Sequence, residues 1–436
     1  MEITNQIKNI DTIQAGNSMY ALAERLYPIC RSITGNGVRE TLQIIKSYIP
    51  LDIIEVPTGT KVFDWEIPEE WNIRDAWIKD DKGEKIIDFK KLNLHVLNYS
   101  TPVEETIPLE ELKKHIFTLP GQPDLVPYRT SYHNRQWGFC MSHNQLVGLE
   151  NKNYKVKIDS DIKPGSLTYG EFYIQGETKA EILVSCHVCH PSLCNDNLSG
   201  IAVAVHLAAF LTTIKPHFSY RFIFIPGTIG SITWLSRNEN ILKNIRYGLV
   251  LNLLGDSSPF HYKKSRRENT ATDTILAYVL ADKEGSEIRN WSPYGYDERQ
   301  FCSPGFDLPV GRLSRKPHGE FPEYHTSADN LDFISGSNMA QSYLLLLDVF
   351  TVMEGNRKWI NLNPKGEPQL GKRGLYKNVG GQSNQQDYQM AILWVLSLSD
   401  GNHTMLDIAN KAGLPFNLLV NAAHDLEKAD LLKEIN

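Results

Sequence analysis

The sequence predicts an α/β fold whose main domain contains a mixed, mostly parallel sheet flanked by helices. Between residues 181 and 353, strand-like runs alternate with helix-like runs, the order in which helices connect parallel strands. Runs such as EILVSCHV and YRFIFIP are almost entirely apolar, as expected for strands covered on both faces. Hydrophobic residues make up 41% and charged residues 22% of the 436 residues, which is a globular composition.

The N-terminal part predicts two helices followed by a strand. Residues 17–48 show helical periodicity that Gly35 and Gly37 interrupt. Residues 53–65 are rich in β-branched side chains, which favour a strand and a turn.

Residues 65–160 differ from their surroundings, because they are rich in Trp, Tyr, Pro, Asn and His and contain only short strand-like runs. We expect a small β-rich domain here, inserted into an α/β domain formed by residues 1–64 and 161–360. In that α/β domain the expected strands are residues 181–188, 220–226, 247–255 and 308–314. The expected helices are residues 199–214, 232–245, 270–282 and 338–353.

The C-terminal region predicts a linker and a small helical module. Residues 361–385 are rich in Gly, Asn, Gln and Lys, as linkers are, and residues 386–436 fit a winged-helix domain of three helices. This module contains seven acidic and three basic residues. Since a helix that enters a DNA groove is expected to be basic, we expect a packing or protein-binding role and no nucleic-acid partner.

Charge, hydropathy and cysteine content argue against a nucleic-acid binder, a membrane protein and a secreted disulfide-rich protein. The formal net charge of −6 argues against a general nucleic-acid or anionic-membrane binder. The apolar stretch at residues 343–353 is far shorter than the roughly 20 residues that span a bilayer. The N-terminus lacks the pattern of a secretory signal, and six cysteines are too few for a disulfide scaffold, so we expect free thiols in a cytoplasmic protein.

The densest group of reactive side chains runs from Cys186 to Asp196, between a buried strand and a helix. A structural zinc site of Cys186, Cys189 and Cys194 is one interpretation, although the chain lacks the second CxxC of a zinc ribbon. A redox CxxC is another, although Cys186 ends a strand and does not begin a helix. A third is an open, hydrolytic metal site that includes His187 and Asp196, and simple packing of these residues is the fourth.

A second histidine motif favours the hydrolytic site. The segment YHTSADN places His325 in a loop before the last long helix, with Asp329 as an outer partner of its imidazole or as a helix cap. His190 is either a metal ligand or a substrate-binding residue, and we place it with the substrate. His206 lies on an apolar helix face and is expected to be a core residue.

The stretch HVCHPSLCNDNLSG resembles the metal motif of the zinc exopeptidases that include leucine aminopeptidase, glutamate carboxypeptidase and glutaminyl cyclase. Nearly the whole chain resembles a bacterial aminopeptidase-like group with an inserted β-rich domain and a C-terminal winged helix, often found in polysaccharide-biosynthesis loci. The stretches WNIRDAWI, RQWGFC, SHNQL, GYDERQFCSPGFDLPVG and PGTIGS carry this resemblance. It implies one zinc held by His187, Asp196 and His325.

The chain departs from that pattern at several positions. Cys189 stands where active two-zinc members have Asp, and Gly227 and Thr228 stand where they have a Glu pair that supplies the general base and a metal ligand. The next Asp ligand falls near Asn252, with Asp256 close by. One zinc is therefore expected, since the second lacks most of its ligands.

The missing base leaves the function open. Four carboxylates are candidates to replace it, and Asp297 and Glu298 are preferred among Asp256, Asp297, Glu298 and Glu323. Arg299 is a candidate partner for a substrate carboxylate.

The first hypothesis for the function is a zinc-dependent hydrolase acting on a peptide-like or amino-sugar amide, with acyl transfer of the glutaminyl-cyclase kind as a variant of it. The alternatives are a binding protein that lost catalysis and a winged-helix regulator.

Overall fold

The computed structural model describes residues 6–375 and 383–435. The chain divides into two compact units, of which one comprises Ile10–Leu345 and the other is built mainly from Leu346–Asn436. Each unit is described by itself.

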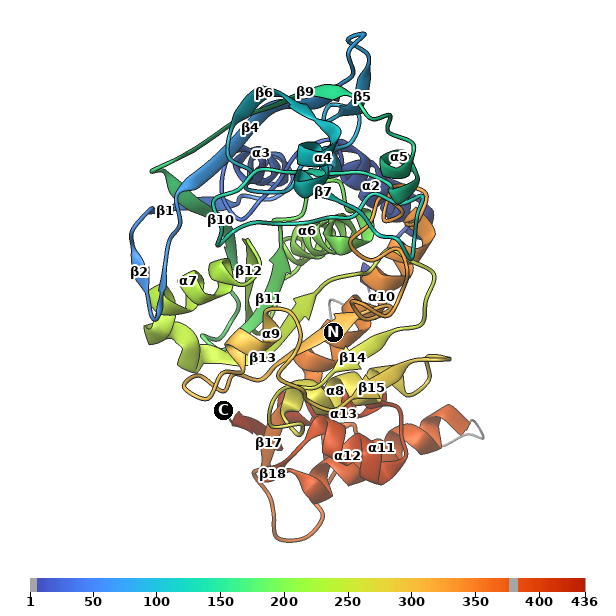
Figure 1. Cartoon of the computed structure of the whole chain (residues 1–436). Coiled ribbons are helices and arrows are strands. Elements are labelled where there is room, and N and C mark those ends of the chain that lie inside the picture. Colours follow the sequence, from blue (N-terminus) through green and yellow to red (C-terminus); the bar gives the residue numbers. More distant parts are fainter. Residues whose placement is uncertain (1–5, 376–382, 436) are drawn as a thin grey trace. The chain divides into compact units, whose positions relative to one another are not determined.

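An eight-stranded sheet forms the centre of the larger unit (Figure 1). In sheet order its strands are β1 (Asp52–Pro57), β10 (Ser166–Ile174), β12 (Ser219–Ile225), β11 (Glu181–His187), β13 (Ile245–Leu251), β16 (Val310–Ser314), β14 (His261–Lys263) and β15 (Glu287–Arg289). The four central strands β12, β11, β13 and β16 are parallel, whereas β1, β10 and β14 pair antiparallel with their inner neighbours. This confirms the predicted mixed, mostly parallel sheet.

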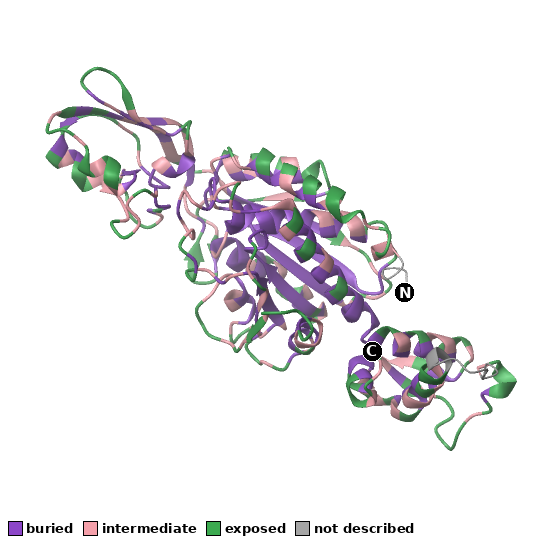
Figure 2. Ribbon diagram, turned by 90° about the vertical axis from the view of Figure 1, so that its right-hand side faces the viewer, coloured by how far each residue is buried: buried purple, intermediate pink, exposed green. Residues whose placement is uncertain are grey.

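Helices flank this sheet. They are α2 (Thr12–Leu26), α3 (Asn36–Lys46), α6 (Gly200–Leu211), α7 (Ile229–Asn238), α8 (Ala271–Leu280), α9 (Glu298–Phe301) and α10 (Gly336–Gly355), with the 3₁₀ turn η4 (Glu239–Asn244). Strands β11 and β12 are buried at every position, and Figure 2 shows the buried sheet strands between helices with exposed outer faces. The hydrophobic core therefore lies along the parallel strands.

The segment after β11 turns sharply into the core. The π-helix η3 (Cys194–Ser199) leads into α6, and a Cβ at Gly200 would lie 2.3 Å from Asn197 Oδ1, so a larger residue there would have to displace the buried Asn197 amide. Among the described residues, the helical stretch Cys194–Leu211 has the length and hydropathy to cross a membrane, but 83% of it is buried inside the fold. Burial of this kind is typical of a core helix.

The segment between β1 and β10, called the inserted segment below, contains a separate antiparallel sheet in the order β5-β4-β9-β6 (Figure 1). Its strands are β4 (Glu70–Lys79), β5 (Lys85–Asp88), β6 (Val103–Pro108) and β9 (Asn153–Lys163). Shorter elements accompany it: β2 (Lys61–Val62), β3 (Trp65–Glu66), β7 (Ile116–Phe117), β8 (Phe139–Cys140), α4 (Leu109–Leu112), α5 (His143–Val147), η1 (Asn93–His95) and η2 (Lys113–His115). A β-bridge between Pro127 and Thr326 joins this segment to the loop that contains His325.

The smaller unit contains three helices and a three-stranded sheet. The elements are β17 (Lys358–Asn361), η5 (Gly371–Arg373), α11 (Ser383–Leu398), β18 (Asp400–Thr404), α12 (Met405–Ala412), α13 (Phe416–Lys428) and β19 (Leu432–Ile435). The three helices match the sequence prediction. Strand β17, however, pairs with both β18 and β19, so this module already begins before the expected linker of residues 361–385. Residues 376–382 of that linker lie outside the described residues.

Candidate metal centre

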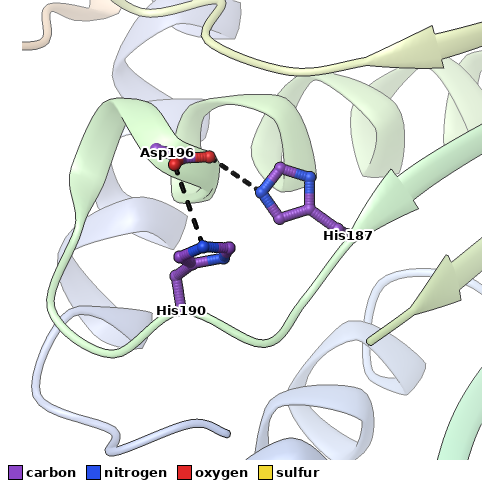
Figure 3. A group of neighbouring side chains, drawn as sticks. All are labelled: His187, His190 and Asp196. Atoms are coloured by element: carbon purple, nitrogen blue, oxygen red, sulfur yellow. Dashed lines mark hydrogen bonds and ion pairs between the residues drawn. The ribbon is translucent and has the colours of Figure 1, made fainter. Parts of the chain in front are cut away.

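Asp196 lies at the centre of a group of imidazoles. His187 Nε2 is 2.8 Å from Asp196 Oδ1, and His325 Nε2 is 3.0 Å from Asp196 Oδ2. His190 Nε2 lies 3.9 Å from the same Oδ2, and Figure 3 shows His187 and His190 pointing at the carboxylate from two sides. The donor atoms of His187, His190 and Asp196 all lie within 4.8 Å of one another. The structure therefore brings together the three predicted ligands and adds His190 to them.

The parallel sheet explains why these residues meet. His187 is the last residue of β11, and the chain positions that follow β12, β13 and β16 lie at the same edge of the sheet. Ligand sites in such sheets form at the carboxyl ends of the strands. Asp329 fixes the loop opposite, because its carboxylate accepts the backbone N–H groups of Asn195 (2.5 Å) and Asp196 (3.0 Å). Asp329 thus holds the backbone at the start of η3. This resembles the expected cap role more than the alternative role as partner of the His325 imidazole, with which Asp329 makes no hydrogen bond among the described residues.

The electrostatics of the group suit a metal ligand set. Burial raises the pKa of Asp196, but the neighbouring imidazoles outweigh it and hold that pKa well below its usual value. Burial lowers the pKa of His190 to about 3, so this imidazole is neutral at pH 7 and has a lone pair to offer. A carboxylate and neutral imidazoles are the ligands that zinc accepts.

The nearby cysteines have other partners. Burial raises the pKa of Cys189 to about 12 and that of Cys186 well above its usual value, which disfavours the thiolates that metal binding and redox chemistry require. Cys189 Sγ accepts the Gly227 N–H at 3.2 Å, and Cys186 Sγ accepts an N–H of the Asn197 amide at 3.2 Å. These contacts favour the histidine and aspartate site over the two cysteine interpretations.

Three tyrosines line the group, and none of them was predicted from the sequence to have a role of its own. The Tyr296 ring stacks on His187 with centroids 5.0 Å apart, and its hydroxyl donates to Asp196 Oδ2 at 3.2 Å. The Tyr324 ring stacks on His325 at 3.9 Å. Tyr128, from the inserted segment, meets His325 edge-on at 5.1 Å. Tyr296 and Tyr324 adjoin predicted site residues in the sequence, whereas Tyr128 has no such signal.

Position 227 faces the metal centre. A Cβ built on Gly227 would lie 3.6 Å from His187 Cβ and 4.0 Å from Asp297 Oδ2. Asp297 is buried, its Oδ1 accepts the Ser231 hydroxyl at 2.9 Å, and burial raises its pKa to about 6. Thr228 has φ of 33°, a conformation that β-branched residues rarely adopt and that is typical of functional turns.

The other predicted carboxylates are placed differently. Glu298 is fully buried and pairs with Lys263 at 2.9 Å, and Asp256 accepts an N–H of the Asn195 amide at 2.8 Å. Glu323 is partly exposed two residues before His325. Arg299 is half-buried, and its Nε has no hydrogen-bond partner among the described residues. Of the four candidate bases, Asp297 is the one that borders position 227.

Two further sequence-derived residues are informative. His206 lies on α6 with Nδ1 2.8 Å from the Ala202 carbonyl and Nε2 2.9 Å from Ser18 Oγ, so it is a satisfied structural histidine, as expected. Asn252 directly follows β13 and is fully buried, and within the described part of the chain neither polar atom of its side-chain amide has a partner. A buried amide without partners is rare and is typical of a site that holds a further group.

Comparisons with known proteins agree with this architecture. A family profile described as "Domain of unknown function (DUF4910)" matches residues 20–356, and a winged helix-turn-helix profile matches residues 357–434. The chain belongs to the DUF4910 family. A Clostridium acetobutylicum relative, a candidate polysaccharide biosynthesis protein with an aminopeptidase-like domain, is 51% identical over 99% of each chain.

Solved structures place the DUF4910 chain among the peptidase folds. A crystal structure of a candidate peptidase from Clostridium acetobutylicum has a TM-score of 0.91 and 49% identity, covering 100% of this chain and 99% of its own. A Shewanella amazonensis peptidase M28 precursor (TM-score 0.56, 13% identity, 81% and 96% covered) shares the fold. The Bacillus subtilis zinc aminopeptidase also shares the fold, with a TM-score of 0.55 and 14% identity, covering 78% of this chain and 94% of its own. The aminopeptidase-like resemblance, the peptidase-type fold and the winged helix predicted from the sequence are thereby confirmed.

Proposed function

We propose that this protein is a zinc-dependent hydrolase of the aminopeptidase type that cleaves the amide bond of a peptide-like or amino-sugar substrate. The observation that carries the proposal is the Asp196 carboxylate, with His187 at one oxygen and His325 at the other. The peptidase fold supports it, and the name of the 51% identical relative supports a link to polysaccharide biosynthesis. The six unpaired cysteines support a cytoplasmic location.

The residues present fit a single zinc ion. Three of the residues His187, His190, Asp196 and His325 would hold it, which leaves the fourth position for water or substrate, and the partnerless Asn252 amide at the same sheet edge is consistent with a further bound group. When bound, zinc polarises a substrate carbonyl and lowers the pKa of a water molecule.

Asp297 is the residue that we assign as general base. Its Oδ1 is held by the Ser231 hydroxyl, which leaves Oδ2 toward the space in front of Gly227. A base whose pKa lies near the working pH is effective, and burial raises the pKa of Asp297 to about 6. In the reaction, the carboxylate removes a proton from the attacking water as the carbon–oxygen bond forms. It then delivers that proton to the leaving nitrogen as the carbon–nitrogen bond breaks.

Metal content tests the proposal directly. Elemental mass spectrometry of protein purified without added zinc or a chelating tag is expected to find about one zinc per native chain and little in His187→Ala or His325→Ala. The matched control is His206→Ala, which removes a structural imidazole on α6 and should keep the metal. A native protein that binds no zinc even when zinc is supplied would overturn the proposal.

A second candidate function is a binding protein that has lost catalysis, and the observation that favours it is Gly227. The Cβ of a residue at this position would make only ordinary contacts of 3.5 Å or more, so a side chain can begin here without a clash, and Gly227→Glu is the variant that restores the missing carboxylate. Amide hydrolysis by Gly227→Glu, together with none by the native protein, would support this alternative. Native hydrolysis that is lost in His325→Ala would exclude it.

A further inference from the structure

A second cluster of buried charges lies beside the metal centre. The side chains of Lys263, Arg312 and Glu298 are 4%, 4% and 0% exposed. Glu298 Oε1 is 2.9 Å from Lys263 Nζ and 3.9 Å from Arg312. Two cations therefore share one carboxylate, and among the described residues neither Arg312 Nε nor Glu298 Oε2 has a hydrogen-bond partner. Buried charge without a counter-charge is costly, so a cluster with one excess positive charge favours an anion nearby.

His318 connects this cluster to the substrate side. Its Nδ1 lies 2.8 Å from Arg312, and because a guanidinium can only donate, Nδ1 must accept. The proton of the neutral ring is then on Nε2, where it can be donated to a ligand. Burial, and next the Arg312 charge, lower the pKa of His318 to about 4, so the ring stays neutral at pH 7.

The surrounding rings place His318 next to the metal centre. Its ring meets Tyr296 edge-on at 4.9 Å and lies 6.2 Å from Tyr324. These same two tyrosines stack on His187 and His325. The imidazole is half-buried, so one side of it is open to a ligand. His318 is thus separated from the candidate metal ligands by one layer of aromatic side chains.

We propose that His318, backed by Arg312, forms a subsite that binds a carboxylate of the substrate. The proposal rests on the proposed function, because it names the substrate class of that same site: amides that contain a free carboxylate beyond the cleaved bond. A carboxylate has one negative charge, which matches the single excess positive charge of Lys263, Arg312 and Glu298, whereas a phosphate has more. Arg299, the residue expected to have this role, forms no ion pair with the cluster in the described part of the chain.

Calorimetric binding tests the subsite without requiring turnover. The probes are L-alanyl-L-alanine and its C-terminal amide, which differ only in the carboxylate, titrated into the full chain with zinc supplied. We expect the free acid to bind at least about tenfold more tightly. The preference should disappear in His318→Phe, which keeps an aromatic ring but removes the donor. His403→Ala, in the C-terminal unit, should keep it.

The outcomes separate this inference from the proposed function. Equal affinity for the two probes, or binding of neither, would overturn the subsite even if the protein hydrolyses amides. A carboxylate preference that persists in His318→Phe would also overturn it. A preference that depends on His318 supports the subsite even if hydrolysis is absent. Stronger competition by inorganic phosphate than by acetate would overturn the assignment to a carboxylate. If His318→Phe unfolds, His318→Gln, which retains an N–H donor, should keep part of the preference.

Discussion

At the scale of single residues, Asp297, the proposed general base, offers the most direct test of the proposed catalysis. We expect Asp297→Asn to lower kcat by about 10²- to 10⁴-fold, because the amide cannot accept the proton. KM and zinc content should change little, since Asp297 does not contact Asp196 in the described structure and its Oδ1 is held by Ser231. Steady-state kinetics with an amide substrate, alongside elemental analysis, measure both quantities. An unchanged kcat would show that another group is the base.

The sequence leaves two roles open for His190, as a metal ligand or as a substrate-binding residue, and a variant of this residue distinguishes them. The structure places its Nε2 3.9 Å from Asp196 Oδ2 and its ring 4.9 Å from that of His187. We therefore expect His190→Ala to weaken zinc binding by at least about tenfold. Removal of a metal ligand should weaken zinc binding at least as much as removal of a residue that hydrogen-bonds to a ligand. Zinc titration by calorimetry measures this, with His206→Ala as the control. Unchanged zinc affinity with a raised KM would instead make His190 a substrate-binding residue.

At the scale of elements, Glu70 joins the inserted sheet to the main one. It begins β4, its carboxylate oxygens accept from Arg39 of α3 at 2.7 Å and 2.6 Å, and Oε2 also accepts the Ser166 N–H at the start of β10. The Arg39 hydrogen bonds lower the pKa of Glu70 to about 2. Because the folded pKa lies below the unfolded one, the stabilisation is present above about pH 4.5 and is lost as the pH falls toward 2.

Glu70→Gln should therefore reduce the free energy of unfolding by about 1–3 kcal/mol at pH 7 and by much less at pH 2.5. Urea unfolding at the two pH values measures the difference. The exposed pair of Glu110 and Lys113 provides the control, since Glu110→Gln should have no measurable effect. A loss for Glu70→Gln that does not depend on pH would mean that packing, and not ionisation, explains it.

The sequence predicted those elements whose pattern is local. Strand β11 and helix α6 follow from their apolar runs, and His187 and Asp196 follow from a motif that spans ten residues. Strand β18 was missed because DGNHT has little β propensity, and β17 because its partners are distant in the sequence. Tyr128 could not be predicted as a site residue, since only the folded chain brings it against His325.

At the scale of the whole molecule, the C-terminal module has a DNA-binding shape, but its helices lack the excess of basic residues that DNA binding requires. A family profile for winged helix-turn-helix domains matches residues 357–434, which contain nine basic and eight acidic side chains, and the part from residue 386 to residue 436 contains seven acidic and three basic ones. We expect the full chain to show no salt-sensitive binding to duplex DNA at low ionic strength, because phosphate neutralisation supplies most of such affinity. Fluorescence anisotropy with a labelled duplex measures this. Binding that weakens steeply with salt would support the regulator hypothesis instead.

Zinc should stabilise the two units of the molecule unequally. All four candidate ligands lie within Ile10–Leu345, whereas the winged helix belongs to the other unit. A ligand that binds only the folded form stabilises the unit containing its site by about 2.7 kcal/mol at 100 times its Kd. For a unit of this size, that corresponds to a rise in Tm of roughly 4 °C.

Scanning calorimetry of the full chain, with and without zinc, should therefore show two transitions, of which only the larger moves. The His187→Ala variant should show the same two transitions and no shift, because the metal site is lost while the fold of both units is kept. A shift of both transitions together would mean that the units unfold as one, and a shift that persists in His187→Ala would place the metal elsewhere. Either result would contradict a metal centre built around Asp196 in an independently folding peptidase-like unit.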